Sequence, residues 1–152
     1  MMQAQVDDII DAVHETSLSW QQTSFPERAA LLNRAAEVLR QQKQEFAALM
    51  TTEMGNTLSS AEGEVEKCAW VCEYYAEHGE KFLAPEAIDS DASSSGIVYR
   101  PLGTVLAVMP WNFPFWQVFR FDAPTLMAGN AGLLKHASNV SDCALAIESV
   151  FQ

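Results

Sequence analysis

The sequence predicts an α/β protein in which N-terminal helices precede the first βαβ unit of a parallel sheet. Three observations lead to this prediction. Apolar residues recur at helical spacing through residues 6–82, loop-forming residues fill positions 89–96, and from residue 104 the pattern becomes strand, helix, strand, helix. This order is typical of a right-handed βαβ unit. A parallel sheet needs more than two strands, so we expect the chain to be the front part of a longer protein.

The totals describe a globular chain and exclude several function classes. Of its 152 residues 49% are hydrophobic and 19% charged, which is enough to bury a core. The net charge of −11 and the nine scattered Lys and Arg residues argue against nucleic acid as a partner. The N-terminus has neither the basic start nor the apolar centre of a secretory signal, and no apolar run reaches the roughly 20 residues of a membrane span. We therefore expect a cytoplasmic protein.

The three cysteines are Cys68, Cys72 and Cys143. They do not have the spacing of metal ligands, and no Cys or His pair stands nearby, so no metal site is expected. In a chain without an export signal they are predicted to be reduced thiols, the first two of them on one helix face.

Three helical segments occupy the first part of the chain. Apolar spacing from residue 6 predicts an amphipathic helix that ends before Trp20. The next helix begins at Ser24, which forms a capping box with Glu27. A third segment is expected to end at Gly55, with Glu53 in its last turn rather than in a site.

A longer helix is predicted over residues 58–82. Its glutamates Glu62, Glu64 and Glu66 are spaced by two, so consecutive ones point about 200° apart and cannot converge on a metal or an acid/base site. We expect them to lie on a solvated acidic face. The expected buried face comprises Val65, Cys68, Ala69, Cys72, Tyr75 and Ala76.

The strand-bearing part begins after the loop at residues 89–96. Residues 96–100 are predicted to form one strand and residues 104–108 a buried strand. A helix follows through Phe119, and Pro124 is expected to interrupt or restart it. Residues 131–135 then form a second buried strand, followed by a helix from residue 141.

Polar residues leave the ends of both strands, and in open α/β sheets ligands bind at such ends. Pro110, Trp111 and Asn112 follow the first strand, and Lys135 and Ser138 follow the second. The proline turn with its Asn is also compatible with a purely structural turn, and Lys135 with a lysine that extends to solvent from the sheet end. Neither a G-x-G-x-x-G nor a G-x-x-x-x-G-K-[ST] loop is present. These observations alone predict an α/β ligand-binding domain.

Several motifs resemble the NAD(P)-dependent aldehyde dehydrogenase family. They are residues 25–28, 53–55, 61–65, 103–114 (with P-W-N-F-P), 124–130 and 134–138. The resemblance covers the chain from about Trp20 to its end, and residues 115–120 with the K-H-A-S form are most similar to the succinate-semialdehyde dehydrogenase branch. It implies the first part of that family's Rossmann-like fold: a helical part at residues 1–90, an oligomerisation arm at 91–103, and the start of the NAD(P)-binding domain at 104–152.

The resemblance also implies residue roles. Asn112 matches the asparagine whose amide donates to the oxyanion formed when a cysteine thiolate attacks the aldehyde, a donor worth roughly 3 kcal/mol. Lys135 matches the lysine that binds the hydroxyls of the adenosine ribose. Ser138 stands where a glutamate often repels a 2′-phosphate, so NADP is expected to be accepted as well as or better than NAD. The residues that match the wall of the cofactor groove are Val108, Met109, Pro110 and Trp111, and Asn112 is also expected to contact the cofactor.

The family's catalytic cysteine and general-base glutamate match no position of residues 1–152. The chain alone is therefore expected to be inactive, and the full-length enzyme to be a homo-oligomer (dimer or tetramer) acting on a small aldehyde. The alternatives are a truncated, non-catalytic module for cofactor binding or assembly, and an acylating or phosphorylating member of the superfamily.

Overall fold

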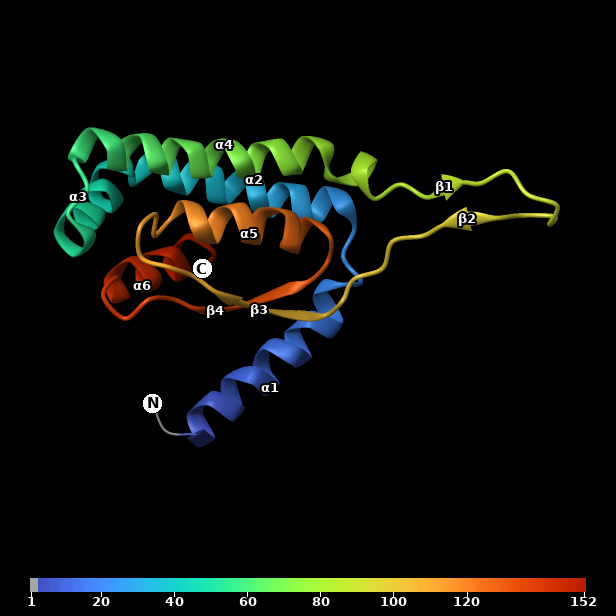
Figure 1. The fold of residues 1–152 in the computed structure, drawn as a ribbon, viewed down its shortest axis with the longest axis horizontal. Coiled ribbons are helices and arrows are strands. Elements are labelled where there is room, and N and C mark those ends of the chain that lie inside the picture. The colour runs from blue at the N-terminus through green and yellow to red at the C-terminus, as the bar shows by residue number, and fades with distance from the viewer. Residues whose placement is uncertain (1–2) are drawn as a thin grey trace.

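The computed structural model describes residues 3–152, which form a helical layer, a projecting arm and a two-stranded parallel sheet (Figure 1). This is the α/β arrangement that the sequence predicts. The elements in chain order are α1 (Gln3–Trp20), α2 (Phe25–Gln41), α3 (Lys43–Met54), α4 (Leu58–Phe82), β1 (Glu86–Ala87), β2 (Gly96–Ile97), β3 (Thr104–Val108), α5 (Trp116–Met127), β4 (Ala131–Lys135) and α6 (Ser141–Val150). Within these residues no helix is both long and apolar enough to cross a membrane.

The local signals at the helix ends are confirmed, with one exception. Ser24 Oγ accepts from the Glu27 N–H, and Glu27 Oε2 accepts from the Ser24 N–H at 2.7 Å, so the capping box that begins α2 is present. Gly55 ends α3 with φ +77°, a conformation that favours glycine. The prediction that the first helix ends before Trp20 was wrong. Trp20 belongs to α1, and its indole Nε1 donates to the Leu126 carbonyl at 3.1 Å, which ties α1 to the end of α5.

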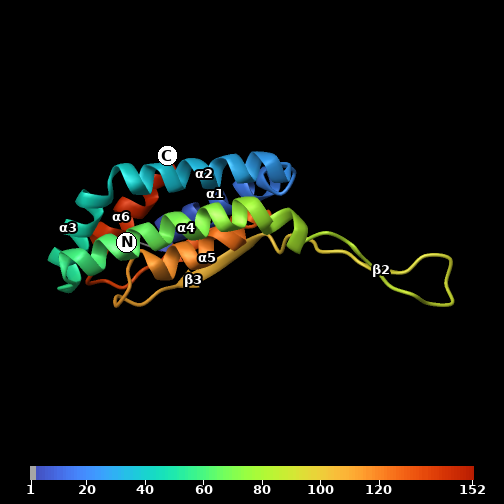
Figure 2. The ribbon, with the colours of Figure 1, turned by 90° about the horizontal axis from the view of Figure 1, so that it is seen from above.

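The core lies where α4 packs against α2, α3 and α5 (Figures 1 and 2). Four of the six residues expected on the buried face of α4 are fully enclosed, and Tyr75 and Ala76 are partly buried against them. The fully enclosed side chains from α4 are Val65, Cys68, Ala69 and Cys72. All three cysteines are buried free thiols, and burial raises the pKa of Cys72 to about 12.

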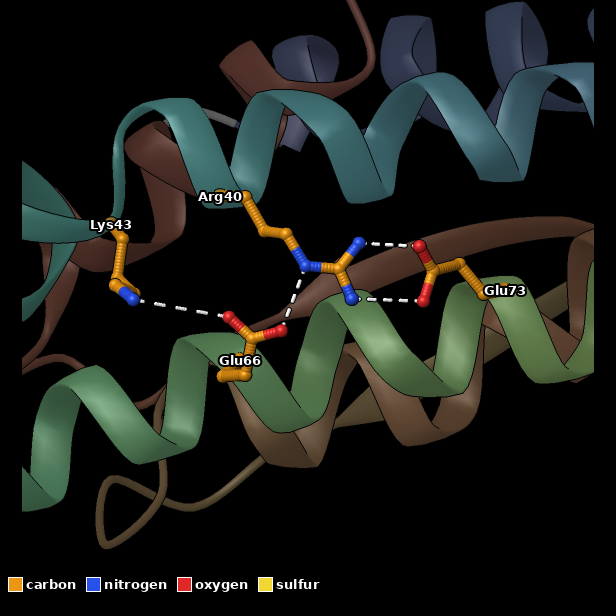
Figure 3. Close-up of polar contacts among 4 residues, drawn as sticks. All are labelled: Arg40, Lys43, Glu66 and Glu73. Carbon is orange, nitrogen blue, oxygen red and sulfur yellow. Dashed lines mark hydrogen bonds and ion pairs between the residues drawn. The ribbon is translucent and has the colours of Figure 1, made fainter.

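On the outer side, α2 and α4 are joined by a charged network (Figure 3). The Arg40 guanidinium donates to Glu66 through Nε at 2.7 Å and pairs with both carboxylate oxygens of Glu73. Lys43 Nζ lies 3.9 Å from the second oxygen of Glu66. Glu66 therefore lies on the solvent-facing side of α4 as predicted, but as a member of an ion-pair network.

β3 and β4 are parallel, with Thr104 opposite Ala131 and Val108 opposite Lys135, which confirms the βαβ unit. The expectation that β3 is a fully buried strand was wrong. Ala107 is buried, whereas Leu106 and Val108 are 61% and 66% exposed. Successive side chains of a strand point to opposite faces, and within residues 3–152 one face of β3 is left open.

The helix after β3 continues through Pro124, so the predicted interruption was wrong. A proline inside a helix removes one N–H donor, but its carbonyl still accepts, and the Pro124 oxygen takes the Ala128 N–H at 3.0 Å. Ala123 and Met127 on either side of it are buried in the core. This packing holds the last turn of α5 in place, and Gly129 ends it with φ +82°.

The arm extends well away from the body in both ribbon views (Figures 1 and 2). Its strands β1 and β2 are antiparallel, with Glu86 opposite Ile97. β1 was not predicted, and the strand expected over residues 96–100 is limited to Gly96–Ile97. Beyond Ile97 the two segments of the arm remain linked, because the Tyr99 hydroxyl donates to Glu86 Oε1 at 2.6 Å.

Candidate functional site

The two loops predicted to carry the site are side by side at the carboxyl end of the sheet. Val108 and Lys135 are register partners, and the Met109 N–H donates to the Lys135 carbonyl at 3.1 Å, so pairing continues one residue into the first loop. Trp111 is 50% exposed, and Asn112 and Ser138 are exposed as well. The expected wall and lysine of a cofactor groove thus lie on neighbouring, open segments.

His136 links these two loops. Its Nδ1 accepts from the Ala137 N–H at 2.8 Å, so the proton of the neutral ring is on Nε2. Nε2 then donates to the Pro114 carbonyl at 2.9 Å. The ring therefore joins the end of the Pro110–Pro114 turn to the loop that follows β4, a role that the sequence did not reveal.

Glu64 contradicts the prediction of a solvated acidic face. Its side chain is buried, and its Oε1 accepts from the N–H groups of Phe115 and Trp116, each at 2.9 Å. Burial raises its pKa, opposed by these two N–H donors and by Lys67. A signal was present in the sequence. Position 64 falls on the same helix face as positions 61, 65 and 68, all of them apolar and fully buried.

Glu53 likewise accepts hydrogen bonds from the first N–H groups of a helix, in this case α6. The prediction that Glu53 only completes the last turn of α3 was therefore wrong. Its two carboxylate oxygens accept from the N–H groups of Asp142 and Cys143 at 2.9 and 2.8 Å. Burial alone would raise the pKa of Glu53, but these hydrogen bonds outweigh it and the pKa is lowered. Helix α5 and helix α6 therefore both receive their N-terminal cap from the helical layer.

A third charged group, Arg28, holds the other end of α5. It is buried at 6% exposure and donates to the Met127 carbonyl at 3.2 Å and to the Thr23 carbonyl at 2.8 Å. A Cβ placed on Gly129 would come within 2.8 Å of its guanidinium. Arg28 therefore fixes the turn between α1 and α2 against the C-terminus of α5.

A cavity of about 370 Å³ opens between α4 and the start of α5. Asn112, Lys67, Arg120 and Glu64 are among the residues that line it. Lys67 Nζ lies 3.9 Å from the centre of the Trp116 ring, a cation–π contact. The hollow is therefore lined by one amide, two cationic residues and one acidic residue.

The cysteines of the chain are poor candidates for a nucleophile here. Cys68, Cys72 and Cys143 are 0% exposed, and burial raises the pKa of each thiol. A nucleophilic cysteine needs an accessible thiolate, and these thiols have neither access nor the low pKa. None of these three buried thiols is therefore placed to act as a nucleophile.

The aldehyde dehydrogenase family model matches residues 1–152, the whole chain. The chain belongs to the aldehyde dehydrogenase family. A probable succinate-semialdehyde dehydrogenase [NADP(+)] of Synechocystis sp. is 56% identical over 150 residues, which cover 99% of this chain and 33% of that relative. Succinate-semialdehyde dehydrogenase [NADP(+)] 1 of Mycobacterium tuberculosis is 50% identical over 154 residues, covering 97% of this chain and 34% of its own length. The chain thus spans about a third of the length of the curated relatives it matches.

Solved structures agree with these relatives. Succinic semialdehyde dehydrogenase from Streptococcus pyogenes, in complex with NADP+, superposes with a TM-score of 0.95 at 33% identity, over 99% of this chain and 33% of that one. Gox0499, whose structure concerns cofactor and substrate selection, gives a TM-score of 0.97 at 39% identity, over 99% of this chain and 33% of its own. The predicted family, its succinate-semialdehyde dehydrogenase branch and the fold class are confirmed. The roles of individual site residues stay predictions.

Proposed function

We propose that this chain forms the cofactor-binding and oxyanion-binding part of an NADP-dependent dehydrogenase that oxidises succinate semialdehyde to the acid. One observation carries the proposal: Asn112, Lys67 and Arg120 all line the cavity between α4 and α5. Succinate semialdehyde has an aldehyde at one end and a carboxylate at the other. An amide donor and cationic groups in one hollow suit these two ends.

In this proposal the reacting aldehyde carbonyl is placed at Asn112. When a cysteine thiolate supplied from outside residues 1–152 attacks it, negative charge develops on the carbonyl oxygen, and the Asn112 amide donates to that oxygen. A donor held ready for this charge is worth roughly 3 kcal/mol of barrier. Lys67 and Arg120 hold the distant carboxylate, which orients the aldehyde for attack.

The open loops fit a dinucleotide. Val108 and Trp111 offer exposed apolar surface for a flat ring, and the ammonium group of Lys135 is suited to ribose hydroxyls. Ser138 is exposed and uncharged, so nothing at that position repels a 2′-phosphate. NADP+, when bound, supplies the hydride acceptor of the oxidation. The relatives from Synechocystis and Mycobacterium tuberculosis, whose names give NADP(+) as the cofactor, support this proposal.

The decisive experiment restores a complete enzyme. Residues 1–152 replace the corresponding third of the Synechocystis relative, and NADPH formation is followed with succinate semialdehyde and a panel of other aldehydes, with and without phosphate or coenzyme A. We expect phosphate- and coenzyme-A-independent oxidation with a preference for succinate semialdehyde. Dependence on either additive would replace the proposal by a phosphorylating or acylating activity. An inactive chimera would favour a non-catalytic module.

Two further measurements test the assignments. The 152-residue chain alone is expected to be inactive, and aldehyde-dependent NAD(P)H production by the purified chain would refute this. Ser138→Glu in the chimera should shift the ratio of kcat/KM towards NAD, because a carboxylate there repels the 2′-phosphate. An unchanged ratio would refute the role of Ser138.

We also propose that the complete enzyme is a homo-oligomer with the β1–β2 arm between subunits. An isolated two-stranded hairpin is at best marginally stable in water. This arm nevertheless exposes Ile88, Val98 and Tyr99 at 48%, 59% and 44%, together with Leu102 at its base at 87%. Sedimentation of the chimera should give a dimer or tetramer, and Val98→Asp should shift it towards monomer.

A further inference from the structure

The N-terminus of α5 has no cap from its own sequence. Phe115 occupies the N-cap position, and its apolar side chain has no oxygen to offer to the first N–H groups of the helix. The acceptor comes instead from α4, where Glu64 Oε1 takes the Phe115 and Trp116 N–H groups, both at 2.9 Å. A carboxylate is also the favourable charge at a helix N-terminus.

The Pro114–Phe115 peptide group is held at both of its polar atoms. Its N–H donates to Glu64, and its carbonyl accepts from His136 Nε2 at 2.9 Å. The two partners come from elements far apart in sequence, the long helix α4 and the loop after β4. A peptide unit is planar, so fixing its N–H and its carbonyl fixes its orientation.

Burying the Glu64 carboxylate has a free-energy cost that a role in packing alone would not explain. Its side chain is buried, and its second oxygen, Oε2, has no hydrogen-bond partner among the described residues. Burying a carboxylate with one oxygen unpaired is unfavourable, and an apolar side chain would fill the space without that penalty. The hydrogen bonds that Oε1 accepts from the Phe115 and Trp116 N–H groups therefore explain why a glutamate occupies position 64.

We propose that Glu64, acting with His136 across the Pro114–Phe115 peptide, is a positioning residue that holds the Asn112 amide in its catalytic place. This inference rests on the proposed function, because it concerns the same oxyanion donor. Asn112 is two residues before Pro114, and the intervening Phe113 carbonyl accepts from the Gln117 N–H at 3.0 Å. The clamped peptide is thus the nearest fixed point of the backbone that carries Asn112.

The test uses the active chimera with residues 1–152 in place. Glu64→Ala removes the acceptor and should lower kcat about tenfold to a hundredfold, as misplacing a catalytic group by about 1 Å can do. The KM values for aldehyde and cofactor should stay within about threefold, because the binding groups are retained. Glu64→Gln keeps an oxygen acceptor and should recover kcat to within about threefold of the parent chimera.

A matched control separates positioning from general destabilisation. Glu73→Ala makes the same change on the same helix but breaks only the outer ion pair with Arg40, so its kcat should equal that of the parent chimera. Asn112→Ala provides the second control. In that background Glu64→Ala should lower kcat less than about twofold further, because no amide remains to be positioned.

Each outcome decides one statement. An inactive parent chimera contradicts the proposed function itself. With an active parent, an unchanged kcat in Glu64→Ala, or a multiplicative loss in the double variant with Asn112→Ala, contradicts the positioning role alone. If Glu64→Ala gives no folded enzyme, Glu64→Asp withdraws the same carboxylate by one methylene, and an unchanged kcat in that variant also contradicts the proposal.

Discussion

Asp122 makes the stability of the chain depend on pH in a way that can be calculated from its position. It lies on α5 at the apolar groove between α1, β4 and α6, which is lined by Trp20, Leu126 and Leu134 among others. A Cβ added to Gly132 would come within 2.8 Å of Asp122 Oδ1, so the carboxyl lies close against the backbone of β4. Burial raises its pKa from 3.8 to about 7.

The sign follows from comparing the folded and unfolded chains. Between pH 3.8 and about 7 the unfolded chain loses the Asp122 proton while the folded chain keeps it, so this group makes folding less favourable as pH rises. At about 1.4 kcal/mol per pH unit the rise in pKa corresponds to about 4 kcal/mol. Asp122 keeps part of its surface exposed to solvent. Screening by water should therefore reduce this free-energy contribution to about 2 kcal/mol or more.

Asp122→Asn tests the calculation because an amide keeps the shape of the protonated carboxyl and cannot ionise. Urea unfolding of both proteins from pH 4 to pH 8 should show a growing advantage of the variant. That advantage should be near zero at pH 4 and reach about 2–4 kcal/mol above pH 7. A difference that does not change with pH would refute the assignment, as would a variant less stable than the parent at pH 8.

Three further predictions concern the stability of the chain. Glu53→Ala removes the cap of α6 and should lower the free energy of unfolding by about 1 kcal/mol, measured in urea. Arg40→Ala breaks the exposed network of Figure 3 and should cost less than about 1 kcal/mol, with the loss shrinking as salt is added. Gly129→Ala places an alanine in a left-handed backbone conformation and brings its Cβ into a clash with Arg28. Gly55→Ala has the same backbone strain of about 1 kcal/mol but meets nothing within 4 Å, so Gly129→Ala should destabilise the chain more. Equal losses of unfolding free energy would contradict the Arg28 contact.

The helices were the most predictable part of the fold because their signals are local. The capping box at Ser24, the glycine end at Gly55 and the long amphipathic pattern of α4 each depend on residues within a few positions of one another. The parallel strands were predictable from two short apolar runs separated by a helix. The openness of β3 was not, because burial of a strand depends on what lies over the sheet, and sequence pattern cannot reveal that.

At Pro124 in α5, tertiary packing outweighs the local tendency of proline to interrupt a helix. A lone proline removes one helical hydrogen bond, so the sequence alone predicts that the helix is interrupted or restarted there. In the folded chain, Ala123 and Met127 are enclosed on either side of Pro124, and Arg28 holds the Met127 carbonyl. The partner that secures the helix end lies almost 100 residues away, beyond the reach of any local pattern.

The candidate site was half predictable for the same reason. Asn112 follows β3 and Lys135 ends β4, so the parallel pairing of the two strands brings both segments to the same edge of the sheet. Glu53, Glu64 and His136 act on backbone groups between 22 and 90 residues away, so only the folded chain identifies their partners. Periodicity treats a helix as having one buried face, whereas α4 packs against both α2 and α5 and so buries a wider arc, which includes position 64.

The cap that Glu64 provides for α5 also bears on the role of the Asn112 turn. Asparagine is among the residues that most often cap helices, and an Asn just before a helix is usually explained by that role. Here Glu64 accepts from the first N–H groups of α5, and Phe115 occupies the N-cap position. Asn112 is therefore not required to begin the helix, which weakens the purely structural interpretation of the turn. Asn112 is exposed and lines the cavity, which is compatible with the proposed role of its amide.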